Sequence, residues 1–234
     1  MKIDIVTLFP KMFESPFAES IIQRAIKNKI IDLKTHNLRD WALDSYGTVD
    51  DRPFGGDVGM LIRVEPVFNA LKAIKEQTLR PSGTSLDREA ESRIILMSAR
   101  GKKFNQEKAE ELAKLDNLII IAGHYEGFDQ RVSDYMIDEE LSIGDYVLTG
   151  GEIPAMVVVD AVSRLISGVL GKDESSHFES HSEIEINGEK IRPTEYPQYT
   201  RPREFMGHKV PEVLLNGDLK KIKEWQIEQI TKQL

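Results

Sequence analysis

The sequence contains no cysteine, which excludes disulfide bonds, thiolate metal sites and cysteine nucleophiles together. No apolar run approaches the roughly 20 residues that cross a bilayer, and the N-terminal "MKIDIVTLFP" lacks the pattern of a signal peptide. Two phosphate-binding patterns are also missing, because no G-x-G-x-x-G follows the first expected strand and no G-x-x-x-x-G-K-[ST] occurs. We therefore expect a soluble, cytoplasmic protein with no membrane partner, no Rossmann dinucleotide site and no P-loop.

The composition that is present is that of an ordinary globular chain. Its 234 residues are 40% hydrophobic and 30% charged, enough for one sizeable core and a small appendage. The net charge of −8 argues against a general polyanion binder. This charge is unevenly spread, because residues 199–234 carry a small excess of Lys and Arg over Asp and Glu. The tail is therefore the part whose charge fits contacts with nucleic-acid phosphates.

Strand-like and helix-like segments alternate along the first two thirds of the chain. The apolar, β-prone runs are residues 2–8, 30–35, 93–98 and 118–122. Helical spacing or capping predicts helices over residues 16–27, from Pro66, after Asn105, over residues 154–166 and after Asp218. This alternation predicts an α/β fold with a mainly parallel sheet covered on both faces. Further on, a hairpin is expected to turn at Asn187-Gly188, and residues 80–91 are expected to form a loop.

Three glycine-rich stretches are the candidate ligand site: "RPFGGDVGM" at 52–60, "AGHYEGFDQ" at 122–130 and "SIGDYVLTGGEIP" at 142–154. Any one of them alone is more typical of a tight turn. Two of them, however, follow apolar segments, and loops at the carboxyl ends of parallel strands are where α/β proteins bind ligands. Glycine allows backbone to approach a ligand closely. The stretches therefore predict a ligand, such as an adenine ring or a ribose, held by backbone N–H and C=O groups.

Several charged residues near these stretches have more than one interpretation. Arg164 lies in a nearly all-apolar helix, where an arginine must be paired or must reach an anion. His124 is interpreted as a surface or turn histidine, because no second histidine stands at metal-ligand spacing. Glu126 and Asp145 are each compatible with loop-capping roles. Composition alone does not choose among the acids of the following polar segment, Asp173, Glu174, Glu179 and Glu183.

Taken together, these stretches resemble one family, the bacterial tRNA (guanine-37-N1)-methyltransferases of the knotted SPOUT class. The matching motifs, in the family's order, are "FP" (9–10), "TVDDRPFGGDVGM" (48–60), "GHYEGFDQR" (123–131), "SIGDYVLTGGE" (142–152), "GVLG" (168–171) and "YPQYTRP" (196–202). The resemblance implies an α/β fold in which a deep trefoil-knot SPOUT domain with a parallel sheet precedes a small helical C-terminal domain. The implied boundaries are a knotted donor-binding domain over 1–170, a linker over 171–196 and a tRNA-binding domain over 197–234.

The same resemblance implies a reaction and an assembly. A methyl group passes from S-adenosylmethionine to N1 of guanosine 37 of tRNA, in the anticodon stem-loop. The family works as a homodimer with shared active sites, in which the linker of one subunit reaches the donor pocket of the other. Magnesium is a reported requirement of the family, and no ligands for it can be assigned here.

Residues with roles carry over by position. The implied donor pocket comprises Leu96, Met97, Ser98, Gly123, Tyr125, Glu126, Gly127, Ile143, Gly144, Asp145, Tyr146, Val147, Leu148, Gly150, Gly151 and Pro154. Glu179 is the implied general base, and Arg164 aligns with the arginine that stabilises charge developing on the guanine O6. The expected substrate contacts are Asp50, Arg52, Gly59, Ser180, Arg201 and Arg203.

The chain departs from the family pattern at three places. Ala99 stands where a proline is common, Asp57-Val58 stands where Gly-Pro is usual, and Glu179-Ser180-His181 stands where the family has Asp-Ser-Phe. Two alternatives therefore accompany the main interpretation. One is a knotted methyltransferase that acts on another RNA guanosine. The other is a catalytically inactive RNA-binding relative, which only the missing linker aspartate favours.

Overall fold

The chain divides into two units, Met1–Gly171 and Lys172–Leu234. The structure, a computed structural model, describes residues 1–78, 91–170, 179–186 and 188–232. The expected loop at 80–91 lies almost wholly outside these residues. The interpretation of 171–196 as a linker stays a prediction. Among the described residues, no helix combines the length and apolar character needed to cross a membrane.

A five-stranded parallel sheet forms the centre of the first unit. Its strands stand in the order β2 (Asp32–Asn37), β1 (Lys2–Thr7), β6 (Asn117–Ala122), β5 (Ser92–Lys103) and β7 (Glu139–Ser142). The predicted α/β architecture with a parallel sheet is therefore confirmed. Four of the strands match the expected apolar runs, whereas the short edge strand β7 has no such run and was not predicted.

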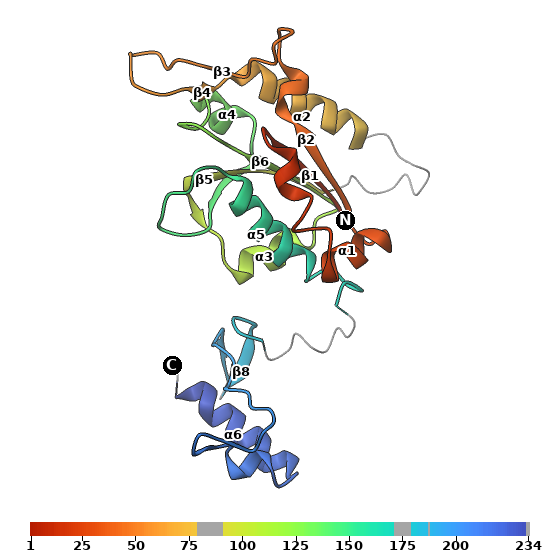
Figure 1. The fold of residues 1–234 in the computed structure, drawn as a ribbon, viewed down its shortest axis with the longest axis vertical. Coiled ribbons are helices and arrows are strands. Elements are labelled where there is room, and N and C mark those ends of the chain that lie inside the picture. The colour runs from red at the N-terminus through yellow and green to blue at the C-terminus, as the bar shows by residue number, and fades with distance from the viewer. Residues whose placement is uncertain (79–90, 171–178, 187, 233–234) are drawn as a thin grey trace. The chain divides into compact units, whose positions relative to one another are not determined.

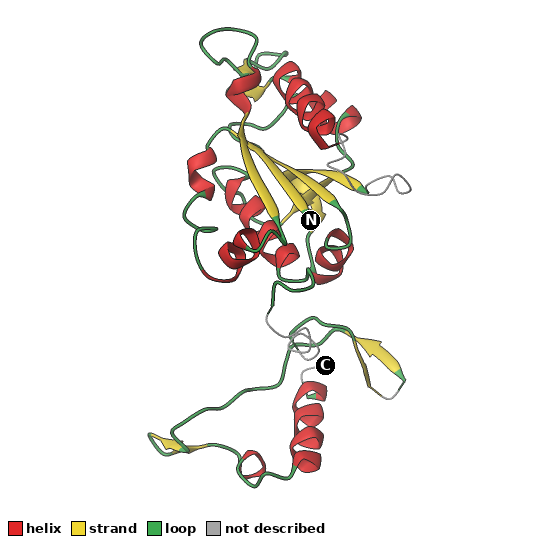
Figure 2. Cartoon of the chain, turned by 90° about the vertical axis from the view of Figure 1, so that its right-hand side faces the viewer, coloured by secondary structure: helices red, strands yellow, loops and turns green. Residues whose placement is uncertain are grey.

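Helices cover both faces of this sheet, as Figures 1 and 2 show. On β6, Leu118 and Ile120 pack into one core with helices α1 (Ser20–Lys27), α3 (Gln106–Leu112) and α5 (Glu152–Ser163). Ile119 and Ile121 pack into a second core with α2 (Val64–Thr78) and α4 (Gln130–Tyr135). Every residue of β6 is buried. A strand buried on both faces is a continuous apolar run rather than an alternating one, which explains the sequence "LIII".

The helices of the first unit are α1 (Ser20–Lys27), α2 (Val64–Thr78), α3 (Gln106–Leu112), α4 (Gln130–Tyr135) and α5 (Glu152–Ser163). Short 3-10 helices, η1 (Pro10–Phe13) and η2 (Leu38–Trp41), and the small ladder of β3 (Asp50–Asp51) with β4 (Leu61–Ile62) complete it. The predicted N-cap is confirmed, because the Asn105 side chain accepts a hydrogen bond from the Lys108 backbone N–H at 2.9 Å. Helix α1 begins four residues later than expected, and α2 begins two residues before Pro66.

Strand β5 continues past the residue where the sequence predicts its end. Its pairing with β7 shifts between Met97 and Lys102, which both stand opposite Leu141. Residues 98–101 therefore bulge out of the ladder. A Cβ on Gly101 would lie 2.6 Å from the backbone of Glu140 and Leu141, so the chain can return to the sheet only with glycine there. The bulge places 98–100 beside the loop that follows β6.

The second unit contains little buried structure. Its elements are the ladders β8 (Ile184–Ile186) with β9 (Glu189–Ile191) and β10 (Glu204–Phe205) with β11 (His208–Lys209), then η4 (Glu212–Leu214) and α6 (Leu219–Thr231). The hairpin pairing is confirmed, because Glu185 stands opposite Lys190, although the turn residue 187 is outside the described residues. The Asp218 cap of α6 is also confirmed. Leu219, the first residue of α6, is 81% exposed.

Candidate functional site

One cavity of about 560 Å³ lies in the first unit, at the carboxyl ends of three neighbouring strands. Its walls are the bulge of β5, the loop after β6 and the loop after β7, closed by Pro154 in the first turn of α5. Because β5 lies between β6 and β7 in the sheet, loops that are far apart in sequence meet at one edge. The site therefore forms where parallel α/β sheets bind ligands.

Two glycine backbones make the wall of this cavity. The Gly151 N–H donates a hydrogen bond to the Gly123 carbonyl at 2.7 Å. A Cβ on Gly151 would lie 2.7 Å from the Gly123 backbone nitrogen, and one on Gly123 would lie 2.4 Å from the Phe128 ring. The loop after β6 and the start of α5 can therefore touch only because Gly151 lacks a side chain, whereas Gly123 leaves room for the Phe128 ring within its own loop.

The cavity is lined by every residue predicted for the methyl donor except Asp145. Asp145 instead forms an ion pair with Lys103, and both side chains are exposed. The glycine-rich stretches at 122–130 and 142–154, predicted to form one site, contribute residues to the same cavity. The role of each residue in binding stays a prediction.

The third glycine-rich stretch joins the cavity through Glu126. The Glu126 N–H donates to the Met60 carbonyl at 3.1 Å, and the Ile62 N–H donates to the Gly127 carbonyl at 2.8 Å. The Glu126 side chain lies directly over Gly59, whose added Cβ would be 2.3 Å from the Glu126 Cγ. Of the predicted substrate residues, Gly59 therefore contacts a lining residue, whereas Arg52 is exposed and Asp50 pairs with Ile62 in the β3–β4 ladder.

The two predicted catalytic residues do not line the cavity. Arg164 follows the last residue of α5 as its C-cap, while Pro154 stands in the first turn. At 1.5 Å per residue the two positions are about 15 Å apart along the axis. Glu179 and Ser180 belong to the second unit, where the Ser180 Oγ accepts a hydrogen bond from the Glu195 N–H at 3.0 Å. Arg201 and Arg203 are exposed there as well.

His124, interpreted as a surface or turn histidine, lies directly before the turn at residues 125–126 but is only partly exposed. Its side chain is 27% exposed, its Nδ1 lies 3.7 Å from Oε2 of the buried Glu152, and its ring packs edge-on against Phe9 with centroids 4.8 Å apart. The histidine follows a fully buried strand and precedes a residue that turns the chain, so the loop folds inward. Its place inside the motif "GHYEG" was the only signal for this position.

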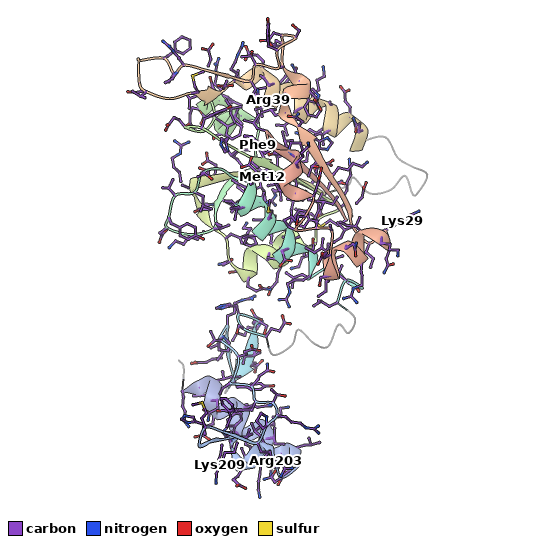
Figure 3. All side chains as sticks on the ribbon, in the orientation of Figure 1. Phe9, Met12, Lys29, Arg39, Arg203 and Lys209 are labelled. Carbon is purple, nitrogen blue, oxygen red and sulfur yellow. The ribbon has the colours of Figure 1, made fainter. Side chains whose placement is uncertain are left out.

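Tyr125 holds an unusual backbone conformation in the cavity wall. Its φ is +60°, a region that residues other than glycine adopt rarely. Arg39 on η2 donates hydrogen bonds to the Gly47 carbonyl at 2.9 Å and to the Tyr125 hydroxyl at 3.4 Å. Figure 3 labels Arg39 in the first unit, together with Phe9 and Met12. The sequence has no pattern that links Arg39 to this loop, and it was not predicted.

Other lining residues were not predicted individually; they come from β4, the β5 bulge, β7, α4 and the loops after β6 and β7. They are Leu61, Ala99, Arg100, His124, Phe128, Gln130, Ser133, Leu141, Ser142 and Thr149. On α4, the N-cap Asp129 accepts hydrogen bonds from the Arg131 side chain, which hold the pKa of that carboxyl below its usual value. Among the described residues, no group of three or more His, Asp and Glu side chains could hold a metal ion.

Comparison with known proteins gives a match over nearly the whole chain. The family model described as "tRNA (Guanine-1)-methyltransferase TrmD" matches residues 1–233. A tRNA (guanine-N(1)-)-methyltransferase of Geobacter sp. (strain M21) is 48% identical over 97% of this chain and 83% of its own length. Proteins of the same name from Dehalococcoides mccartyi (strain BAV1) and Ruminiclostridium cellulolyticum are 51% and 48% identical, over 97% and 98% of this chain and 84% and 91% of theirs.

Proposed function

The chain belongs to the tRNA (guanine-1)-methyltransferase TrmD family, and we propose that it transfers a methyl group from S-adenosylmethionine to N1 of guanosine 37 in tRNA. The observation that carries this proposal is the glycine-walled cavity, because its lining coincides with the stretches through which the chain resembles the family. Since the reaction needs tRNA, we assign the enzyme to the cytoplasm.

The cavity fits the methyl donor on three grounds. Its volume of about 560 Å³ lies within the roughly 300–1,000 Å³ typical of small-molecule sites. The glycine-rich loops of the lining bring backbone close to the cavity, where adenine and ribose can approach it. The Glu126 carboxylate in the lining offers a negative charge to a positive sulfonium. When bound, the donor supplies an electrophilic methyl group.

The residues of this chain have to unstack the target base, remove a proton and stabilise an oxyanion. N1 lies on the Watson–Crick edge of guanine and carries a hydrogen, so the base must be exposed before it can react. In our proposal the Glu179 carboxylate would accept the N1 proton as the methyl group passes from sulfur to N1, with S-adenosylhomocysteine as the leaving group. Arg164 stabilises negative charge that develops on O6. Ser180, Asp50, Arg52 and Gly59 help to position the nucleotide.

A homodimer with shared sites and a deep trefoil knot complete the proposal. The separation of about 15 Å between Pro154 and Arg164 along α5 favours a site in which Arg164 serves the cavity of a second copy. Helix α5 also carries Ile153 and Val157, which are 49% and 41% exposed and stand one turn apart, and it packs against η1, where Met12 is 43% exposed. Apolar side chains on one exposed helix face support a partner surface there.

The tail and the metal complete the partner assignments. Arg201 and Arg203 are exposed basic residues of the second unit, and we propose that they contact the phosphates of the anticodon stem-loop. A magnesium requirement stays a prediction without assigned ligands. If chelation of divalent metal ions leaves methyl transfer unchanged, the prediction of a magnesium requirement is wrong.

The deciding experiment measures transfer of a labelled methyl group to a tRNA transcript with guanosine at position 37. A matched transcript carries adenosine at 37 and is otherwise identical. We expect label in the first and none in the second, with mass spectrometry of nucleosides identifying 1-methylguanosine. Label that persists in the adenosine transcript would identify another RNA guanosine as the target. Donor binding without transfer to either transcript would identify an inactive RNA-binding relative.

A further inference from the structure

A buried acid, Glu152, lies behind the cavity wall, and none of the roles above uses it. It is the first residue of α5 and is 2% exposed. The Thr7 hydroxyl donates a hydrogen bond to its Oε1 at 2.9 Å. The N-terminus of α5 favours a negative charge here, but a buried carboxylate also needs hydrogen-bond donors on its second oxygen. That oxygen, Oε2, lies 3.7 Å from the Nδ1 of His124.

The same geometry leaves His124 in need of an acceptor. Its Nδ1 is buried, and among the described residues it has no hydrogen-bond partner. Phe9 and Tyr125 hold the ring edge-on, with centroids 4.8 Å and 5.4 Å away, so the ring cannot turn outward without losing both contacts. Buried polar atoms are nearly always paired. A proton on Nδ1 would give Glu152 the donor that its second oxygen lacks.

Gly150 provides the space in which the two side chains meet. A Cβ at this position would lie 2.4 Å from the Glu152 Oε2 and 2.6 Å from the His124 Nδ1. Gly150 and His124 both line the cavity, and Gly150 precedes the Gly151 N–H that binds the Gly123 carbonyl. The acid and the imidazole therefore connect the loop after β6 to the start of α5, beside the glycines that form the cavity wall.

We propose that Thr7, Glu152 and His124 form a positioning network for the methyl donor. His124 carries its proton on Nδ1 and donates it in a hydrogen bond to Glu152, which Thr7 holds from the other side. The network keeps Tyr125 and the two glycine loops in the conformation that binds the donor. None of the three groups exchanges a proton with the substrate, so the network acts on donor affinity and not on the chemical step. This inference rests on the proposed function.

Two substitutions at His124 separate the hydrogen bond from the packing of the ring. His124→Phe keeps an aromatic ring between Phe9 and Tyr125 but removes both nitrogens, whereas His124→Asn keeps an N–H donor near the Nδ1 position and loses the ring. The measurements are the Kd of S-adenosylhomocysteine by calorimetry, the KM for the donor and kcat. We expect His124→Phe to raise Kd and KM about tenfold, because the variant loses one charge-assisted hydrogen bond. Its kcat should stay within about twofold of the parent value. His124→Asn should stay within about threefold of the parent in Kd.

His36 supplies a matched control, because its Nε2 lies 2.7 Å from Oδ1 of the buried Asp4 and it does not line the cavity. His36→Phe should lower the Tm while leaving the Kd unchanged. The network is disproved if His124→Phe binds S-adenosylhomocysteine as tightly as the parent, or if His124→Asn is impaired as much as His124→Phe. A parent protein that does not bind S-adenosylhomocysteine at all would instead overturn the proposed function.

Discussion

The two units of the chain hold their functional residues in different ways. In the first unit, the loop after β6 follows a strand whose residues are all buried, and backbone hydrogen bonds such as Gly151 to Gly123 join this loop to the start of α5. In the described part of the second unit, Pro193 and Ile230 are the buried residues. Glu179 lines a small hollow with both of these residues, and its carbonyl accepts a hydrogen bond from the Ser182 hydroxyl.

This difference indicates a division of labour between the units. A cavity supported by two cores is formed before the ligand arrives, so binding needs little ordering of the chain. A unit with few buried apolar contacts has low local stability, and binding can order it. We infer that the first unit determines affinity for the donor, whereas the second unit contributes to turnover and RNA affinity once its partners are present. Each prediction below changes a residue of one unit, and its effect should be confined to the function inferred for that unit.

The largest effect is expected from Glu179→Gln. The substitution keeps the size of the side chain and removes the carboxylate that accepts the N1 proton. Turnover should fall by about 100-fold or more, while the Kd of S-adenosylhomocysteine stays that of the parent. Single-turnover transfer assays and calorimetry measure the two quantities. Glu179→Asp is the matched variant, and it should retain much of the rate. Near-parental turnover by the Gln variant would place the base elsewhere.

The next effect is expected at Gly151, in the first unit. An added methyl group would lie 2.7 Å from the Gly123 backbone nitrogen and 3.0 Å from the Ala122 Cα. Neither atom can move without shifting the cavity wall, so Gly151→Ala should raise the Kd of S-adenosylhomocysteine roughly 10- to 100-fold. Gly217→Ala in the second unit is the control, because its φ of +74° also strains the backbone of the variant although the residue does not line the cavity. Equal Kd values for the two variants would show that the wall is not rigid.

The sequence predicts the sheet and the glycine loops because both depend on local patterns. The run Leu118–Ala122 is apolar because β6 is buried on both faces, and glycines mark the places where backbone meets backbone. The bulge of β5 and the inward fold of His124 could not be predicted, since each depends on contacts with residues distant in sequence, Leu141 and Glu152. Arg39 and Tyr125 likewise stand 86 positions apart. No local pattern encodes the position of Glu179 relative to the cavity, because the two belong to different units.

A smaller effect is expected from the basic residues of the second unit. Arg201→Ala and Arg203→Ala should each weaken tRNA binding several-fold and lower the slope of log affinity against log salt by about one. The donor Kd should not change, because neither residue lines the cavity. Filter binding over a series of salt concentrations measures both quantities. Lys29→Ala, an exposed cation of the first unit, is the control. A salt slope that changes in the Lys29 variant but not in the two arginine variants would show that the first unit, and not the second, binds RNA.

The smallest effect is a dependence of stability on pH at Asp129. Its carboxylate accepts hydrogen bonds from the Arg131 side chain at 2.8 Å and 2.7 Å, and these lower its pKa in the folded protein. A lowered folded pKa means that the stabilisation is present above the unfolded pKa of about 3.9 and is lost as the pH falls through the folded value. Asp129→Asn keeps the helix cap but should lower the free energy of unfolding at pH 7 by less than about 1 kcal/mol. The difference from the parent should vanish at strongly acidic pH.

Urea unfolding from pH 7 down to pH 3 tests this, and the two tryptophans of the chain allow the units to be observed separately. In a Trp225→Phe background, the fluorescence of Trp41 reports on the first unit alone. Glu183→Gln is the matched variant in the second unit, where Lys190 likewise lowers the pKa of the Glu183 carboxyl. It should leave the Trp41 transition unchanged at every pH. A Trp41 transition that responds to Glu183 as much as to Asp129 would mean that the two units unfold together, and the separation of donor binding from turnover would then lose its physical basis.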